Sequence, residues 1–444
     1  MNRKILDLAV PNIISNISVP LLGIVDMALM GHLESDSYIG AIALGSLIFN
    51  FLYWGLGFLR MGTSGFTAQA RGRRDLKEAI MVLSRATFIG LAASFLLILL
   101  QRPLESLSFL LLKGETRVEE LAMSYFRIRI WAAPAVLGQF ALLGFFLGMQ
   151  NARLPMVVLV STNVINIVCN YLFVMKMGME SDGVALGTVI AQYSGLLIAL
   201  FFLLRYFSRL FHYWSLQATL QWKKLRHFLG VNRDIFIRTM CLVAVFSIFT
   251  ARSASSDVES EGQETILAVN SLLMQFFMFF SFLIDGFAHA AEALTGRYIG
   301  SGERVRLKKL IRLLFIWGSG IGLFFTLLYL VGGEFLFSLL TSNREVIENA
   351  RPYFTWVILV PLVSFTAFLW DGIFIGATAG REMRNAMLVS TLLIFFPAYF
   401  LAGRWMGNHG LWLAFILFMG SRGITMQLLS RVAVYRKAGS AGID

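Results

Sequence analysis

The sequence is poor in charged residues, histidine and cysteine. Charged residues make up 14% of the 444 residues, and the chain has only 5 histidines and 2 cysteines. Both cysteines, Cys169 and Cys241, lie in apolar segments where a thiol behaves as a small hydrophobic group, so no disulfide framework is expected. No phosphate-binding loop and no His-Glu-x2-His pair occurs. These absences argue against a nucleotide-driven pump and against an intramembrane enzyme, and no cofactor or metal is expected.

Apolar residues are what the sequence has in abundance. They make up 57% of the chain, and the mean hydropathy is +0.71, which is too high for a water-soluble globule. Many apolar runs reach the roughly 20 residues that a spanning helix needs. The runs are continuous rather than alternating, which excludes the pattern of a transmembrane barrel. The sequence therefore predicts an all-α polytopic membrane protein.

The net charge of +12 comes from basic clusters in every second connection between the apolar runs. Because basic loops stay in the cytoplasm, we expect an even number of helices with both termini cytoplasmic, and no nucleic-acid partner. The basic clusters are at Arg3/Lys4, Arg71/Arg73/Arg74/Lys77, Arg205 to Arg226, Arg304/Arg306/Lys308/Lys309, Arg381/Arg384 and Arg431/Arg436/Lys437. The alternate connections carry acids, at Glu34/Asp36, Glu180/Asp182, Asp257/Glu259/Glu261/Glu264 and Glu345/Glu348.

The apolar runs predict 12 helices in two sets of six. The first set is expected near 5–30, 38–70, 77–100, 119–150, 153–175 and 183–206. The second is expected near 225–252, 264–299, 306–331, 346–378, 383–402 and 409–436. This predicts an N-lobe over residues 1–206, a basic cytoplasmic linker over 207–224 and a C-lobe over 225–444.

The two sets resemble each other in sequence. Ala43 to Phe51 aligns with Ala268 to Phe276, and Pro134 and Gly144 have counterparts in Pro361 and Gly372. Six plus six helices with both termini inside place the halves in the same orientation, related by a pseudo-two-fold axis along the membrane normal. Parallel repeats of this kind are typical of transporters that work by alternating access, with the substrate cavity between the halves.

Acidic groups within apolar segments are candidate functional residues, because a charge inside the bilayer costs at least a few kcal/mol. Asp26 lies near the outer end of the first predicted helix, where a carboxylate can gain and lose a proton. Pro11 and Pro20 interrupt the backbone hydrogen bonding of that helix and make it a candidate hinge. The alternative for Asp26 is an interfacial carboxylate that faces water.

Three asparagines form a polar stripe on the fifth predicted helix. Asn163, Asn166 and Asn170 are spaced by three and four residues and so share one face. Their amides could hold a carboxylate in either protonation state, and Thr188 on the sixth helix could join them. The alternative is a purely structural contact between helices, which asparagine and threonine commonly make in membranes.

A second set of candidate functional residues, mostly acidic, lies in the C-terminal half. Asp285, His289 and Glu292 share a helix face, and Asp371 sits on the tenth predicted helix. Together these residues are a candidate second ion site, although their pattern is a weak match to zinc coordination. The structural alternative is a salt bridge to Arg238, which lies in an apolar segment of the same half. In the first half, Arg60 is the other charge within an apolar segment besides Asp26, and it is expected near the inner mouth.

These motifs resemble the multidrug and toxic compound extrusion family, specifically its DinF-like branch, over essentially the whole chain. The resemblance is carried by Asp26-Met-Ala-Leu-Met-Gly-His32, Phe58-Leu-Arg-Met-Gly-Thr-Ser-Gly65, Asn166-Ile-Val-Cys-Asn170, Gly183-Val-Ala-Leu-Gly-Thr188 and Asp285-Gly-Phe-Ala-His-Ala-Ala-Glu292. It implies two six-helix lobes and export of amphiphilic, often cationic, solutes driven by a proton or sodium gradient. It also implies that Asp26 is the coupling carboxylate of the first lobe.

One position departs from the family pattern. Where the family has an aspartate four residues after the asparagine of the fifth helix, this chain has Asn170. A sodium site requires several oxygen ligands and compensating negative charge, whereas proton binding requires one carboxylate. H⁺ is therefore favoured over Na⁺ as the coupling ion. We expect a monomeric inner-membrane antiporter whose partners are small organic substrates and membrane lipids. A flippase for a lipid-linked substrate is the alternative, as is a passive channel.

Overall fold

The computed structural model describes residues 1–30, 36–111, 115–254 and 263–437, and these residues form helices joined by short turns, with no strand among them. Within this part of the chain, 12 helical segments are long and apolar enough to cross a membrane. The predicted all-α polytopic fold is therefore confirmed. The spans run Asn2–Gly23, Ser37–Gly72, Leu76–Leu99, Thr116–Gly148, Arg153–Lys176, Ser181–Tyr213, Trp222–Ala254, Ile266–Gly300, Arg304–Gly333, Arg344–Gly376, Gly380–Met406 and Asn408–Arg436.

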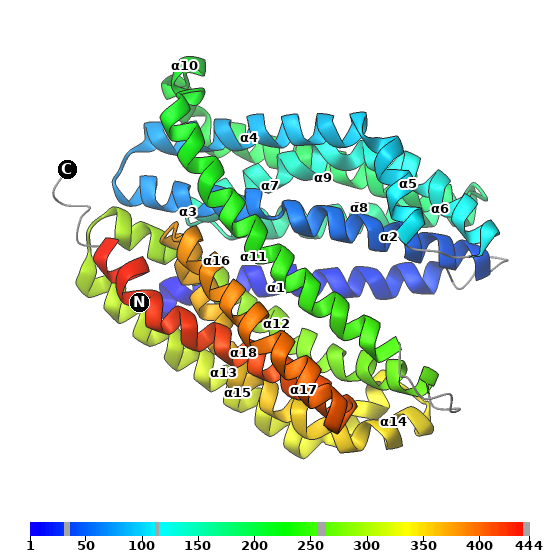
Figure 1. Cartoon of the computed structure of the whole chain (residues 1–444). Helices are drawn as coiled ribbons and strands as arrows, with labels where there is room; N and C mark the ends of the chain where they lie inside the picture. Colours follow the sequence, from blue (N-terminus) through cyan, green and yellow to red (C-terminus); the bar gives the residue numbers. More distant parts are fainter. Residues whose placement is uncertain (31–35, 112–114, 255–262, 438–444) are drawn as a thin grey trace. The chain divides into compact units, whose positions relative to one another are not determined.

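The helices gather into two compact units (Figure 1). The first consists of Val10–Asn232, and its helices are α1 (Asn2–Met30), α2 (Asp36–Leu56), α3 (Phe58–Gly72), α4 (Leu76–Leu99), α5 (Gln101–Leu111), α6 (Thr116–Arg129), η1 (Ile130–Ala132), α7 (Ala133–Gly148), α8 (Arg153–Asn170), η2 (Tyr171–Lys176), α9 (Ser181–Phe207), η3 (Ser208–Tyr213) and α10 (Leu216–Thr219). We call this the N-unit.

The second unit, the C-unit, consists of Arg233–Asp444 together with Met1–Ala9. Its helices are α11 (Trp222–Ala254), α12 (Gln263–Gly300), α13 (Arg304–Leu340), α14 (Arg344–Ala350), η4 (Arg351–Tyr353), α15 (Phe354–Gly376), α16 (Gly380–Leu388), η5 (Val389–Phe395), α17 (Phe396–Met406), α18 (Asn408–Ser430) and η6 (Arg431–Arg436). Helices α1 and α11 each contribute residues to both units. The lobe and linker boundaries predicted from hydropathy stay a prediction.

Local sequence explains where the spans bend. The second span is interrupted at Gly57, whose backbone N–H donates to the carbonyl oxygen of Trp54 at 3.2 Å, and α3 begins at the next residue. The fourth span changes from α6 to α7 through a 3₁₀ turn just before Pro134, which sits in the first turn of α7. Proline is tolerated there because the first turn of a helix leaves its N–H groups unpaired. Helix α5, between the third and fourth spans, is a short element that the hydropathy pattern did not predict.

Equivalent pairs of helices in the two units come into very close contact at a glycine. In the N-unit, a Cβ on Gly144 of α7 would lie 2.4 Å from the carbonyl oxygen of Arg60 on α3. In the C-unit, a Cβ on Gly372 of α15 would lie 2.1 Å from the carbonyl oxygen of Ala288 on α12. Small residues allow helix backbones to approach in this way in membranes. The two glycines are the counterparts aligned in the sequence, so the internal repeat extends to the packing of each unit.

Candidate functional site

Three of the four predicted coupling residues meet in the N-unit. Asn170 of α8 donates from Nδ2 to Oδ1 of Asn166 at 3.2 Å, and Asn166 donates from Nδ2 to Oγ1 of Thr188 on α9, also at 3.2 Å. Thr188 in turn donates to the carbonyl oxygen of Val184 at 2.9 Å. Asn166 and Asn170 are both buried. The predicted stripe is therefore a directed chain of neutral donors and acceptors, which we call the amide chain.

A glycine on α9 makes room for the amide chain. A Cβ on Gly187 would lie 2.3 Å from Oδ1 of Asn170, so a larger residue there would displace the carboxamide. Gly187 precedes Thr188 directly, which lets one turn of α9 supply both the space and the hydroxyl. Gly187 lies within the Gly183–Thr188 motif, and the sequence alone did not predict a role for it. Its four-residue spacing from Gly183, on a helix that faces Asn166 and Asn170, is the signal that could have identified it.

The polar stripe of α8 also contacts helix α1. Asn163 donates from Nδ2 to Oγ of Ser18 at 2.9 Å, and Ser18 donates to the carbonyl oxygen of Ser15 at 2.7 Å. Helix α1 runs without interruption through Pro11 and Pro20. The hydroxyl of Ser15 donates to the carbonyl oxygen of Pro11 at 2.9 Å. The hinge role of the two prolines stays a prediction. Asp26 belongs to α1, but its side chain lies outside the described residues.

The C-unit holds a buried acid between two arginines. Oδ2 of Asp371 on α15 accepts from Nη2 of Arg238 on α11, and it also accepts from Nη2 of Arg422 on α18 at 2.5 Å. The three side chains are at most 9% exposed. The structural alternative considered for Asp371, an ion pair with Arg238, is therefore present. One carboxylate between two guanidinium groups joins three helices of the unit, because each buried cation requires a counter-charge.

The other members of the candidate second ion site lie on α12. Nδ1 of His289 is 3.5 Å from Oε2 of Glu292, one helical turn away, and Asp285 interacts electrostatically with Arg422. Among the described residues, no three histidine, cysteine or acidic side chains lie close enough together to hold a metal ion. The four predicted residues thus fall into a His289–Glu292 pair and two acids, Asp285 and Asp371, that both interact with Arg422. Their role in ion binding stays a prediction.

Some buried charges of the apolar segments were not predicted from the sequence, and two of them are arginines. Arg422 was not included among the buried cations, although it lies within α18 between Phe418 and Met426 and is only 2% exposed. Its position inside an apolar run was a usable signal. Arg85, at 2% exposure on α4, was also overlooked. The list of intramembrane charges drawn from the sequence was therefore incomplete.

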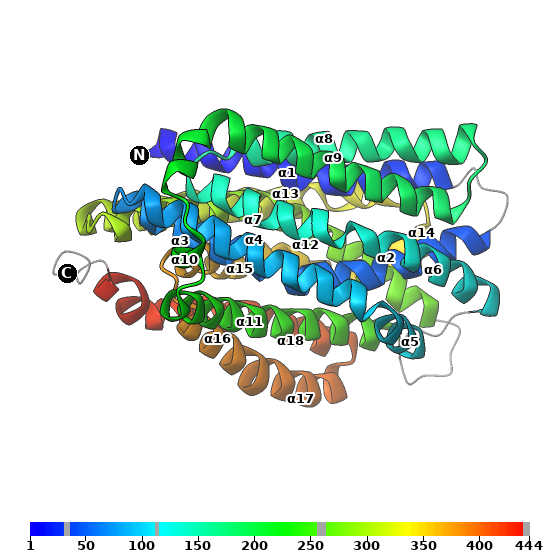
Figure 2. The ribbon, with the colours of Figure 1, turned by 90° about the horizontal axis from the view of Figure 1, so that it is seen from above.

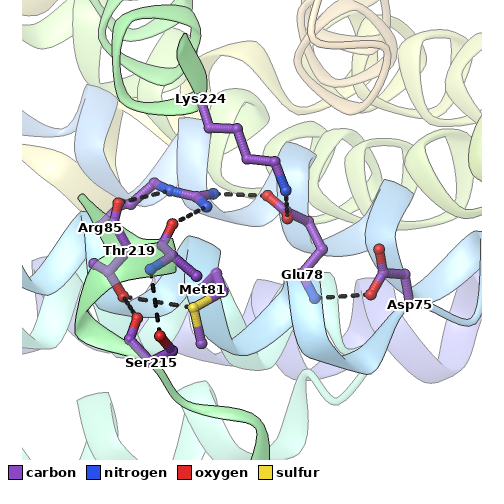
Figure 3. Close-up of polar contacts among 8 residues, drawn as sticks. Asp75, Glu78, Met81, Arg85, Ser215, Thr219 and Lys224 are labelled. Atoms are coloured by element: carbon purple, nitrogen blue, oxygen red, sulfur yellow. Dashed lines mark hydrogen bonds and ion pairs between the residues drawn. The ribbon is translucent and has the colours of Figure 1, made fainter. Parts of the chain in front are cut away.

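Arg85 fastens the segment that connects the two sets of spans. Figure 3 shows its guanidinium between Glu78 and the end of α10. It donates to the carbonyl oxygens of Thr219 and Ala218, each at 3.1 Å, and forms an ion pair with Glu78 at 2.7 Å. Lys224 reaches the other oxygen of Glu78 at 2.5 Å. Arg85 thereby caps the short helix α10, whose last carbonyl groups have no partner within the helix.

In the part of the chain that the structure describes, twelve apolar spans are divided between two units that each bury a polar centre, which is typical of a multi-pass membrane transporter. The MatE family model matches residues 11–172 and again residues 237–400, one segment in each set of six spans. The chain therefore belongs to the MatE family and is a membrane transporter, not an enzyme.

Relatives and solved structures agree with this placement. The chain is 37% identical to DNA damage-inducible protein F of Escherichia coli (strain K12) over 431 residues, covering 97% of this chain and 92% of that protein. It is 22% identical to multidrug export protein MepA of Staphylococcus aureus (strain MSSA476), covering 90% and 88%. A multidrug resistance MATE family transporter, solved in an outward-facing conformation, superposes with a TM-score of 0.86 at 17% identity, covering 98% and 96%, which shows the common fold.

Proposed function

We propose that this protein exports amphiphilic, cationic organic solutes from the cell in exchange for protons that move inward, by alternating access. The proton carrier in this proposal is Asp26, and the amide chain of Asn166, Asn170 and Thr188 orients it. Membership of the MatE family supports transport, and the name of the relative MepA supports multidrug export. The protein acts as a monomer in the plasma (inner) membrane, with both termini cytoplasmic and lipids around it.

The observation that carries the coupling proposal is the hydrogen bond between Ser18 and Asn163. It sets the register between α1 and α8, which begin the first and fifth spans and therefore cross in the same direction. With a rise of about 1.5 Å per residue, Asp26 is expected about 12 Å beyond Ser18, and Asn170 about 10 Å beyond Asn163. The backbone levels of Asp26 and Asn170 thus agree to within about one residue, which supports an interaction between them.

The chemistry of the amide chain favours a proton over sodium. A carboxamide can donate to an ionised carboxylate and accept from a protonated one, so it can accompany Asp26 through both states. Sodium would require several oxygen ligands and further negative charge. The amide chain brings no carboxylate of its own, because Asn170 stands where the family pattern has aspartate.

The flippase alternative is less well supported. A cargo that carries phosphates should favour free arginine or lysine side chains along its path. The two buried arginines of the C-unit, Arg238 and Arg422, both donate to Asp371. Both guanidinium groups are therefore engaged within the unit, which disfavours a cargo that carries phosphates.

The test is dye efflux from proteoliposomes that contain the purified protein, under an imposed proton gradient or an imposed sodium gradient. Proton coupling predicts efflux when the proton gradient alone is present, and no response to sodium at a clamped pH. Efflux driven only by the sodium gradient would contradict the choice of ion. Equal flux without any gradient would contradict secondary transport and indicate a passive channel.

A further inference from the structure

A cavity of about 620 Å³ opens on the N-unit between α5 and α6, and no residue of the amide chain lines it. Its walls include Arg102 and Ser106 from α5, Arg127 from α6 and Trp131 from the following turn. Helix α5 begins two residues after the end of α4, and Figure 2 shows it folded beside α6 at that end of the span. The cavity therefore lies where the third span leaves the membrane.

Basic side chains outnumber acidic ones in the lining of this cavity. Glu105 in its lining accepts from Nε of Arg127 at 3.0 Å, and Nη2 of Arg127 forms an ion pair with the same oxygen at 2.9 Å. That carboxylate is only 10% exposed and already has a cation of its own. The exposed Arg102 makes no ion pair with any acid in the part of the chain that the structure describes. One acid facing two arginines leaves the cavity with a positive charge.

Its surroundings suit a lipid rather than a soluble partner. Trp131 is 53% exposed, and its carbonyl oxygen accepts from the hydroxyl of Tyr193 at 3.0 Å. Tryptophan and tyrosine gather at the membrane–water interface because one end of the ring is apolar and the other polar. Leu107 and Leu110 of α5 are also exposed, at 54% and 68%. A polar, positively charged cavity thus adjoins an apolar surface.

We propose that this cavity binds the phosphodiester headgroup of an anionic phospholipid. The guanidinium of Arg102 is planar and matches two phosphate oxygens at once, and the hydroxyl of Ser106 is a further donor. The acyl chains would lie along the exposed leucines of α5. A zwitterionic lipid is a poorer fit, because its amine would need a carboxylate and Glu105 is already bound to Arg127. This site is independent of the proposed coupling.

The experiment is native mass spectrometry of the purified full-length protein with added phosphatidylglycerol or phosphatidylethanolamine. It compares wild type, Arg102→Gln and the control Arg117→Gln, an exposed arginine on α6. Loss of one arginine contact near a membrane surface is worth about 1 kcal/mol, so Arg102→Gln should retain phosphatidylglycerol about fivefold less well. The control should match wild type, and phosphatidylethanolamine should be retained weakly by all three. An unchanged melting temperature for Arg102→Gln confirms that it folds.

Two results would overturn the proposal. One is equal retention of phosphatidylglycerol by wild type and Arg102→Gln. The charge-reversing variant Arg102→Glu checks that comparison, because it should also retain phosphatidylglycerol less well than wild type does. The other concerns the source of the phosphate. If millimolar inorganic phosphate protects the protein against heating through Arg102 while phosphatidylglycerol does not bind, the cavity takes a free phosphate group and not a lipid.

Discussion

The guanidinium of Arg85 donates from Nε to the carbonyl oxygen of Thr219 across 3.1 Å, although the two residues are 134 positions apart in the chain. Arg85 belongs to a membrane-spanning helix, and Thr219 ends the short helix α10 in the connecting segment. The connecting segment is therefore bound to α4 of the N-unit by these hydrogen bonds. The hydroxyl of Thr219 also donates to the sulfur of Met81 at 3.5 Å, which adds to the attachment.

Replacing Arg85 should release the connecting segment. In Arg85→Ala two carbonyl groups lose their donor and Glu78 keeps only Lys224, so we expect a loss of about 2 kcal/mol or more in stability. Limited proteolysis should then cut within residues 207–224 faster than in wild type. Lys77→Ala, an exposed change on the same helix, is the matched control. Unchanged proteolysis in Arg85→Ala would show that other contacts hold the segment.

Replacing Asp371 should disturb the C-unit as a whole. Asp371→Asn leaves Arg238 and Arg422 buried without their shared acceptor charge, and breaking a buried pair in this way costs about 3–5 kcal/mol. We expect a lower melting temperature in detergent, whereas Glu345→Gln, an exposed change in α14, should have no effect. A variant with wild-type stability but altered ion dependence of transport would instead assign Asp371 to an ion site.

The close contact between α12 and α15 should tolerate no side chain at Gly372. A methyl group there would meet the carbonyl oxygen of Ala288, a backbone atom that cannot rotate away. Overpacking of this kind costs about 1–3 kcal/mol, so Gly372→Ala should lower the melting temperature by several degrees. Gly320→Ala is the control, because a Cβ at that position of α13 would meet nothing within 4 Å. Equal melting temperatures for the two variants would contradict this close contact.

Much of the fold followed from the sequence because bilayer crossing imposes a length on each apolar run. The third span, predicted near 77–100, is α4 at Leu76–Leu99, and the fifth, predicted near 153–175, is Arg153–Lys176. The link between Asn166 and Asn170 could also be predicted, since residues four apart on a helix are neighbours. Such features depend on local spacing alone.

Other features depend on contacts between distant segments and could not be read from one sequence. Arg85 contacts Thr219, and Asp371 is shared by Arg238 and Arg422. Both contacts form only when helices from separate parts of the chain pack in a particular register. Helix α5 was missed because its 11 residues are too few and too polar to resemble a span.

In the proposed mechanism Asp26 carries the coupling proton. The decisive experiment measures dye efflux from proteoliposomes under an imposed proton gradient for wild type, Asp26→Asn and Asp7→Asn. Asp7 lies on the same helix and its side chain is 59% exposed, so its replacement controls for a loss of charge on α1. We expect that Asp26→Asn abolishes proton-driven efflux while Asp7→Asn retains it. Proton-driven efflux that survives in Asp26→Asn would contradict the role of Asp26 as proton carrier and place the carrier elsewhere in the chain.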